Sequence, residues 1–502
     1  MQLTAVTGNI KDLKFDAHIL GIFHGDVISS GVSAFSDPHV DQMITPLFSS
    51  GEISGKFGKM TLVHTYGKIE ANHILVIGLG KSDAFNPSVL RKAIAQACRY
   101  LRNLGVTSSA SISLPAVQAA SLTIESLSQS IAEGIILGLY KYRNHITKEP
   151  DSPVPLTTFA VLGESDESCK SIAKGLLIGK IVAEATNLAR DWSNEPANYM
   201  TPTIMATIAS ELAHTNGIEA EILNREECEV LGMGGFLGVA RGSQEEPKFI
   251  ILRYAGDPED KENNLGLIGK SVTFDSGGIS LKPAAGMGDM KGDMSGGAAV
   301  IAAIQAIAQL KPKINVIAIA AATENLPSGT ATKPGDVLKT ITGKTVEVEN
   351  TDAEGRLTLA DALGYAHQQG IRRLVDVATL TGAIVTSLGN VRAGIFGNNQ
   401  KLIDAVIAAG EETGERMWQF PMDDEYKELN KSAVADLKNT GGRTAGSITA
   451  AQFLAEFATE SEWAHLDIAG VFRKDKDSGE FVKGATGIPV RCLINLAIAL
   501  AK

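Results

Sequence analysis

Four acidic residues and two lysines in the C-terminal half of the chain have the chemistry of a metal site. They lie in three short segments that each contain glycine, at residues 269–282, 289–293 and 350–357. The acids are Asp275, Asp293, Asp352 and Glu354, and the lysines are Lys270 and Lys282. Carboxylates that converge repel one another unless cations neutralise them, so these acids predict a site for two divalent ions that share ligands.

The first segment directly follows an apolar run at residues 264–268, which predicts a buried strand. In open α/β sheets ligands gather at the carboxyl ends of the strands, so Lys270 and Asp275 would lie where a site forms. The alternative for Lys270 and Lys282 is the ordinary one for lysines, a solvated place on the surface.

The second and third segments precede predicted helices at residues 298–310 and 357–368. Asp293 has the alternative role of capping the first of these helices. Asp352 and Glu354 are two residues apart, and in an extended stretch they would present two carboxylates to one point. Their alternative is a turn followed by acidic charges at a helix N-terminus. The presence of all three segments in one predicted domain favours the metal site.

Two domains are predicted from the pattern of apolar residues. In the N-terminal part, strand-like runs such as residues 73–80 alternate with helical runs such as 90–104. A stretch rich in Pro, Asp, Ser and Lys at residues 148–155 is typical of a surface connection, and residues 171–190 predict a long helix. We therefore predict an N-terminal α/β domain at 1–165, a connecting helix at 166–195 and a C-terminal catalytic domain at 196–502.

The C-terminal domain alternates predicted strands with Ala-rich helices, which is typical of a parallel or mixed sheet covered by helices. The predicted fold class is α/β. It combines a smaller N-terminal α/β domain with a larger C-terminal one, built on a central mixed sheet that helices flank. The predicted strands of the larger domain lie at residues 248–254, 264–268, 314–321 and 374–378.

Composition and charge argue against several other classes of protein. Hydrophobic residues make up 44% and charged residues 21% of the chain, as in an ordinary globular enzyme. The net charge of -11 argues against broad attraction to nucleic acid, with a local basic patch as the alternative. The N-terminus lacks a secretory signal, the apolar runs are too short to cross a bilayer, and the four cysteines are isolated. We therefore expect a cytoplasmic protein without a membrane span.

The octapeptide NTDAEGRL at residues 350–357 resembles the signature of the leucyl aminopeptidases, also called cytosol aminopeptidases. The other two acidic segments match that family in order and spacing. Further matching motifs are KPGD at 333–336, ATLTG at 378–382, NTGGR at 439–443 and HLDIAG at 465–470. The resemblance covers about residues 180–495.

The resemblance implies a metal-dependent exopeptidase that releases N-terminal residues, preferably leucine and other apolar ones, from peptides with a free N-terminus. The family uses two divalent ions, Mn²⁺ or Zn²⁺, to activate a water molecule. By the resemblance, Lys270, Asp275, Asp293 and Glu354 hold the tighter ion. Asp275, Asp352 and Glu354 hold the more exchangeable ion. No histidine forms a His-Glu-x-x-His pair, which agrees with such ligands.

The resemblance also implies roles for residues around the ions. Lys282 would stabilise the oxyanion, and Arg356 would hold a bicarbonate ion that shuttles protons; Arg356 also lies beside a predicted helix N-terminus, which favours an anion. The pocket for the first side chain would be lined by Met290, Thr379 and Gly382. The family forms homohexamers of two stacked trimers.

Three alternative functions compete with this one. A two-metal phosphoesterase would use a similar cluster of carboxylates and lysines, but the octapeptide argues against it. A DNA-binding or architectural protein on the peptidase fold is disfavoured by the acidic chain. A catalytically inactive relative is disfavoured because every inferred metal and catalytic position is filled.

Overall fold

The computed structural model describes residues 1–8, 10, 13–25, 38–105, 109–114, 122–148 and 156–501. The chain forms two compact units, Met1–Glu184 with Lys476–Val482, and Ala185–Asp475 with Lys483–Lys502. The long helix predicted at 171–190 is α4 (Asp166–Asn194), and it runs through this boundary. All but the first residue of the predicted connection at 148–155 lies outside the described residues.

The N-terminal unit is a six-stranded sheet in the order β1-β6-β5-β2-β4-β3, with helices beside it. All neighbouring strands are parallel except β3 and β4. The helix predicted at 90–104 begins earlier, at Pro87, because the side chain of Asn86 accepts a hydrogen bond from the Val89 amide at 3.1 Å. The elements are β1 (Gln2–Thr7), β2 (Ala17–Ile22), α1 (Pro38–Ser49), β3 (Met60–His64), β4 (His73–Gly78), α2 (Pro87–Asn103), β5 (Ser109–Ser113), α3 (Ile124–Gly138) and β6 (Thr158–Gly163).

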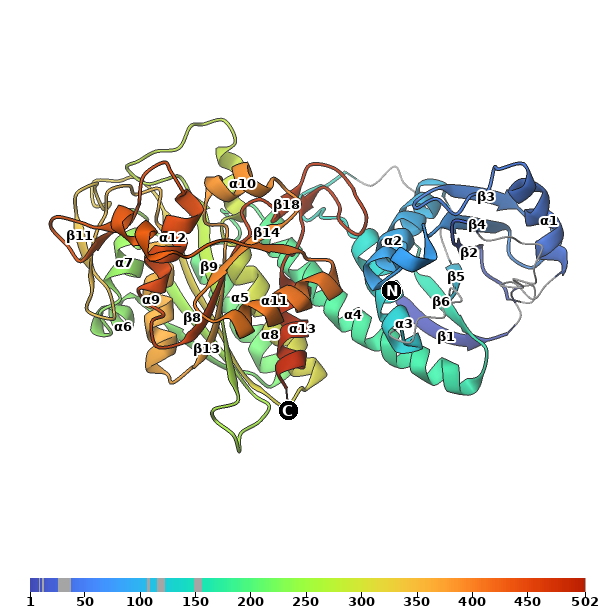
Figure 1. Cartoon of the computed structure of the whole chain (residues 1–502), viewed down its shortest axis with the longest axis horizontal. Coiled ribbons are helices and arrows are strands. Elements are labelled where there is room, and N and C mark those ends of the chain that lie inside the picture. Colours follow the sequence, from blue (N-terminus) through green and yellow to red (C-terminus); the bar gives the residue numbers. More distant parts are fainter. Residues whose placement is uncertain are drawn as a thin grey trace. The chain divides into compact units, whose positions relative to one another are not determined.

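The C-terminal unit is built on an eight-stranded mixed sheet in the order β15-β14-β17-β13-β9-β10-β8-β7. Figure 1 labels its strands β8, β9, β13 and β14. Its four central strands, β17, β13, β9 and β10, are parallel, and β14 and β8 run antiparallel to them. The predicted α/β class with a central mixed sheet is confirmed. The strands are β7 (Glu219–Leu223), β8 (Lys248–Ala255), β9 (Asn264–Asp275), β10 (Asn315–Asn325), β13 (Arg373–Ala378), β14 (Ala393–Gly397), β15 (Met417–Gln419) and β17 (Glu462–Asp467).

Helices cover both faces of this sheet. Gly269 of β9 packs on Gly297 of α8, whereas the next residue, Lys270, packs on Gly355 at the start of α9. Successive residues of a strand point to opposite faces, so α8 and α9 lie on opposite sides of β9. The helices of this unit include α5 (Pro202–Asn216), α7 (Gly234–Ala240), α8 (Ser295–Leu310), α9 (Gly355–Gln368), α10 (Gly382–Leu388), α11 (Gln400–Thr413), α12 (Gly446–Ala455) and α13 (Val490–Leu500).

A second, three-stranded sheet in this unit joins β11 (Val337–Lys339), β12 (Thr345–Glu347) and β16 (Leu437–Lys438). The strands β12 and β16 pair in parallel. This small sheet brings the chain that precedes α9 next to the chain that follows residue 438.

One helical stretch of the described chain, Met287–Leu310, is long and apolar enough to cross a membrane. However, 83% of its apolar window is buried within the protein. A helix that is apolar all round and covered by its own domain behaves as a core helix.

Candidate metal centre

Strand β9 carries two of the predicted site residues, Lys270 and Asp275. The strand was expected to end at residue 268, and this expectation is wrong, because β9 continues to Asp275 between β10 and β13. The register with β10 shifts after the pair Thr323 and Val272, so that β9 contains one extra residue. In a regular strand, two residues five positions apart point to opposite faces of the sheet. The shift places Lys270 and Asp275 on the same face.

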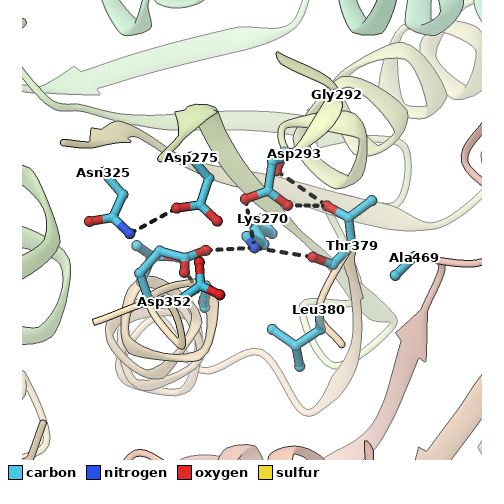
Figure 2. Close-up of polar contacts among 12 residues, drawn as sticks. Lys270, Asp275, Gly292, Asp293, Asn325, Asp352, Thr379, Leu380 and Ala469 are labelled. Atoms are coloured by element: carbon cyan, nitrogen blue, oxygen red, sulfur yellow. Dashed lines mark hydrogen bonds and ion pairs between the residues drawn. The ribbon is translucent and has the colours of Figure 1, made fainter. Parts of the chain in front are cut away.

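Asp293 lies between a 3-10 helix, Met287–Gly292, and α8. The alternative that it caps α8 is wrong: the cap residue is Met294, and no side chain makes a capping bond there. The Asp293 carboxylate points instead to β9, where its Oδ2 lies 2.8 Å from Lys270 Nζ (Figure 2). Thr379 Oγ1 donates a hydrogen bond to its other oxygen at 2.7 Å.

The segment with Asp352 and Glu354 is a turn, so the expected extended stretch is wrong. The Asp352 amide donates to the side chain of Asn350 at 2.9 Å, and the Ala353 amide donates to the Asn350 carbonyl at 3.2 Å. Such bonds from an asparagine side chain favour a turn over an extended chain. Glu354 follows with helical backbone angles immediately before α9, and its Oε1 lies 2.7 Å from Lys270 Nζ.

These segments bring three buried carboxylates together around one lysine. Asp275, Asp293 and Glu354 each offer an oxygen, and these oxygens lie within 4.8 Å of one another. Asp352 stands beside this group with 34% of its side chain exposed. It is linked to the group by Lys282, whose ammonium pairs with both Asp352 and Asp275 Oδ2, the latter at 2.6 Å. The structure thus gathers all four acids and both lysines of the predicted site.

Burial controls the charges of this cluster. It raises the pKa of Asp293, helped by Glu354 and Asp275 and opposed by Lys270. It also raises the pKa of Glu354, with Asp275 adding to the effect. For Lys270 burial acts in the opposite direction, but Asp293 and Glu354 outweigh it and raise its pKa above the ordinary value. Lys270 is therefore held as an ammonium ion that neutralises the carboxylates.

The cluster has the donors that a divalent ion requires. Three carboxylates supply hard oxygen ligands at mutual distances that one ion can span. The second oxygen of Glu354 is buried and has no hydrogen-bond partner. A buried carboxylate oxygen without a partner is unfavourable unless a cation meets it. The residues present therefore fit a metal ion, which would replace the proton on Lys270.

Arg356 was expected just before a helix that starts at residue 357; α9 begins two residues earlier, at Gly355, so Arg356 lies in its first turn, where it is buried. Its Nη1 donates to the carbonyl of Asn439 at 2.7 Å, whereas its Nε is buried without a partner. Burial lowers the pKa of Arg356 to about 10, against the opposing effect of Glu354. The guanidinium is thus a buried cation whose Nε has no partner, but it does not line the open cavity described next.

A cavity of about 510 Å³ opens over the cluster. Lys270, Asp275, Lys282, Asp293 and Asp352 line its polar part, and the predicted pocket residues Met290, Thr379 and Gly382 also line it. Sequence reasoning missed several apolar lining residues, namely Leu380, Val385, Ala469 and Phe472. Leu380 and Ala469 lie within the motifs at 378–382 and 465–470, so these motifs could have indicated that both residues belong to the site.

Sequence reasoning also missed Asn325, the last residue of β10. Its Nδ2 donates to Asp275 Oδ1 at 2.8 Å (Figure 2). The same Nδ2 donates to the Thr351 carbonyl at 3.0 Å. The Gly277 amide donates to the same Asp275 oxygen at 2.9 Å. These bonds fix the orientation of Asp275. Nothing in the sequence around this single asparagine indicated that it belongs to the site.

Comparison with known proteins gives consistent matches over the whole chain. Residues 187–494 match the catalytic domain of the cytosol aminopeptidase family, and residues 19–148 match the N-terminal domain of that family. A probable cytosol aminopeptidase of Alkaliphilus metalliredigens is 44% identical, with 100% of both chains covered. That of Solibacter usitatus is 46% identical, with 99% of both covered.

Two solved structures are also similar. A mutant of tomato leucine aminopeptidase is 33% identical with a TM-score of 0.87, covering 99% of this chain and 96% of that one. The bottromycin maturation enzyme BotP in complex with Mn is 32% identical with a TM-score of 0.84, covering 97% of this chain and 100% of the other.

Proposed function

The chain belongs to the cytosol aminopeptidase family, and on this premise we propose that it is a two-metal aminopeptidase. Its substrates would be peptides with a free N-terminus, from which it releases leucine and other apolar residues. The observation that carries the proposal is the convergence of Asp275, Asp293 and Glu354 around Lys270 beneath an open cavity.

We assign the ligands as follows. One ion would be held by Lys270, Asp275, Asp293 and Glu354, and a more exchangeable one by Asp275, Asp352 and Glu354. Two divalent ions, Mn²⁺ or Zn²⁺, would supply an acidified water and a polarised peptide carbonyl. The similar BotP structure contains Mn, which supports manganese as one of the candidates. Lys282 pairs with Asp275 and Asp352 in this structure. It would move away from both carboxylates when they bind the metal ions.

The side chains of this protein would divide the remaining work. The Lys282 ammonium would face the negative charge that develops on the carbonyl oxygen during attack. Asp293 would accept a hydrogen bond from the free amino group of the substrate. Arg356 would hold bicarbonate as the proton shuttle, since its unused Nε and the N-terminus of α9 both favour an anion.

The cavity wall supports a preference for apolar first residues. Met290, Leu380, Val385 and Phe472 line it, and apolar side chains favour an apolar ligand group such as that of leucine. Methionine in particular adapts its shape to different apolar partners. We further propose a cytoplasmic homohexamer, on the strength of the family resemblance alone.

The requirement for a free N-terminus gives a direct test. Leucyl-p-nitroanilide is expected to be cleaved at least about tenfold more efficiently, in kcat/KM, than its N-acetyl form, because acetylation removes a charge-assisted hydrogen bond to Asp293. The comparison needs one enzyme preparation and both substrates at equal metal concentration. Equal efficiencies would refute the exopeptidase assignment. Hydrolysis of p-nitrophenyl phosphate in place of the leucyl substrate would favour a phosphoesterase instead.

The anchoring role of Arg356 is tested with bicarbonate. In carbonate-depleted buffer the activity of the parent protein is expected to rise with added bicarbonate, whereas the response of Arg356→Ala should be flat. Metal content should be equal in both, because Arg356 is not among the proposed ligands. Arg356→Lys is the matched control for charge, since lysine keeps the cation without the forked donors. Superimposable response curves for the parent and Arg356→Ala would rule out the anchoring role.

A further inference from the structure

The turn that carries Asp352 and Glu354 lies outside regular secondary structure. It occupies the chain between β12, which ends at Glu347, and α9, which begins at Gly355. Backbone groups in such a segment lack the partners that a helix or sheet supplies, so other groups must bind them. Metal ligands on a segment of this kind keep their positions only if something else holds the backbone.

One side chain, that of Asn439, binds four of these backbone groups. Its Oδ1 accepts hydrogen bonds from the amides of Glu349 and Asn350, at 2.9 and 3.3 Å. Its Nδ2 donates to the carbonyls of Asn350 and Ala353, at 2.7 and 3.2 Å. A side-chain amide can accept two and donate two hydrogen bonds, so the capacity of Asn439 is fully used on this turn. The residue is 0% exposed, which excludes water as a competitor.

The backbone of Asn439 is tied to the same region. Its amide donates to the Glu347 carbonyl at 2.9 Å, which continues the pairing of β12 with β16. Its carbonyl accepts the hydrogen bond from Arg356 Nη1 at 2.7 Å. One buried residue therefore contacts both the turn with two proposed metal ligands and the proposed anion-binding arginine.

We propose that Asn439 is a positioning residue, which holds Asp352, Glu354 and Arg356 in one arrangement through its bonds to the turn and to the guanidinium. It contacts neither the carboxylates themselves nor the cavity. The inference rests on the proposed function, because it assumes that Asp352 and Glu354 bind metal. Loss of a group that orients metal ligands typically weakens metal binding about 10- to 100-fold.

The test compares Asn439→Asp and Asn439→Ala with the parent in the full-length protein. Asn439→Asp keeps the shape of the side chain and the two hydrogen bonds that its oxygen accepts. It loses both hydrogen bonds to the carbonyls of Asn350 and Ala353, and places a carboxylate oxygen against them. Asn439→Ala loses all four side-chain bonds. The matched control is Asn264→Ala, at the end of β9 opposite to Asp275. Asn264 is also buried, with 5% exposed. Its side chain donates to the Lys261 carbonyl at 2.8 Å and accepts from the Arg372 amide at 3.1 Å.

Two measurements separate positioning from general stability. Equilibrium dialysis against Mn²⁺ should show the more exchangeable ion bound at least about tenfold more weakly in both Asn439 variants, and unchanged in Asn264→Ala. Hydrogen exchange of the metal-free proteins should accelerate at the Glu349 and Asn350 amides in Asn439→Ala. In Asn264→Ala it should accelerate near Arg372 and not at residues 349–353.

Parent-like Mn²⁺ binding by Asn439→Asp overturns the inference, and so does equal exchange at residues 349–353 in Asn439→Ala and the parent. If Asn439→Ala does not fold, Asn439→Ser with its smaller loss of bonds takes its place in the exchange experiment. If the parent protein binds two ions and cleaves leucyl substrates, and the Asn439 variants match it, only the positioning role is refuted. A parent that does neither refutes the proposed function.

Discussion

Asp275→Ala is expected to lower kcat/KM by about a thousandfold or more and to reduce the occupancy of both metal positions. Asp275 is assigned as a ligand of both ions, and its orientation is fixed by Asn325 and by the Gly277 amide. Metal ions supply several kcal/mol of charge stabilisation, and each factor of ten in rate corresponds to about 1.4 kcal/mol. Metal analysis of the purified variant beside the leucyl-amide assay measures both effects.

Asp289→Ala is the control for the loss of an acid from the same cavity. Asp289 lines the cavity but pairs with Arg473, outside the cluster, so this variant should keep both ions. Chelation of the parent should reproduce the loss of activity, and Mn²⁺ or Zn²⁺ should restore it. Two ions per chain in Asp275→Ala, or full activity in a metal-free preparation of the parent, would show that the assignment is wrong.

Lys282→Ala is expected to lower kcat on the order of a hundredfold or more, as does loss of a donor to an oxyanion. Metal content should be retained, because the Lys282 ammonium competes with cations for Asp275 and Asp352 instead of binding the metal itself. The defect should not depend on bicarbonate, which distinguishes Lys282 from Arg356.

The control for Lys282 is Lys313→Ala. Lys313 is a lysine with 65% of its side chain exposed, and it lies just before β10, at the end of that strand remote from Asn325. It should retain parent-like kcat. A Lys282→Ala variant with kcat within about twofold of the parent would remove the oxyanion role, since that role requires a loss of about 2.7 kcal/mol or more.

The sequence predicted which residues meet but not how the backbone brings them together. Lys270 and Asp275 could be predicted as site residues because they follow an apolar run that indicates a buried strand. The true end of β9 was missed because Lys270, Ser271 and Thr273 interrupt the apolar pattern inside a strand that is buried on both faces. Hydrophobic periodicity cannot report a strand whose polar residues are satisfied by partners distant in sequence.

The same limit applies to the residues that support the site. Asn439 belongs to a motif that matched the family, yet its contacts with residues 349–353 come from a part of the chain far away in sequence. An asparagine that binds backbone groups resembles any turn asparagine when only the sequence is known. Asp293 illustrates the reverse case, since its position before α8 suggested a cap, and only the buried ammonium of Lys270 explains its orientation.

The extra residue in β9 makes the irregular pairing of this strand with β10 a requirement for the site. If β9 kept its length but paired regularly with β10, Asp275 would turn toward the face that α8 covers, away from Lys270, because the two residues are five positions apart. Removal of Thr273 itself would instead leave Asp275 four positions from Lys270, on the same face and still opposite Asn325. In efforts to redesign this protein, the pairing that turns Asp275 to the face of Lys270 is to be preserved as strictly as the residues themselves.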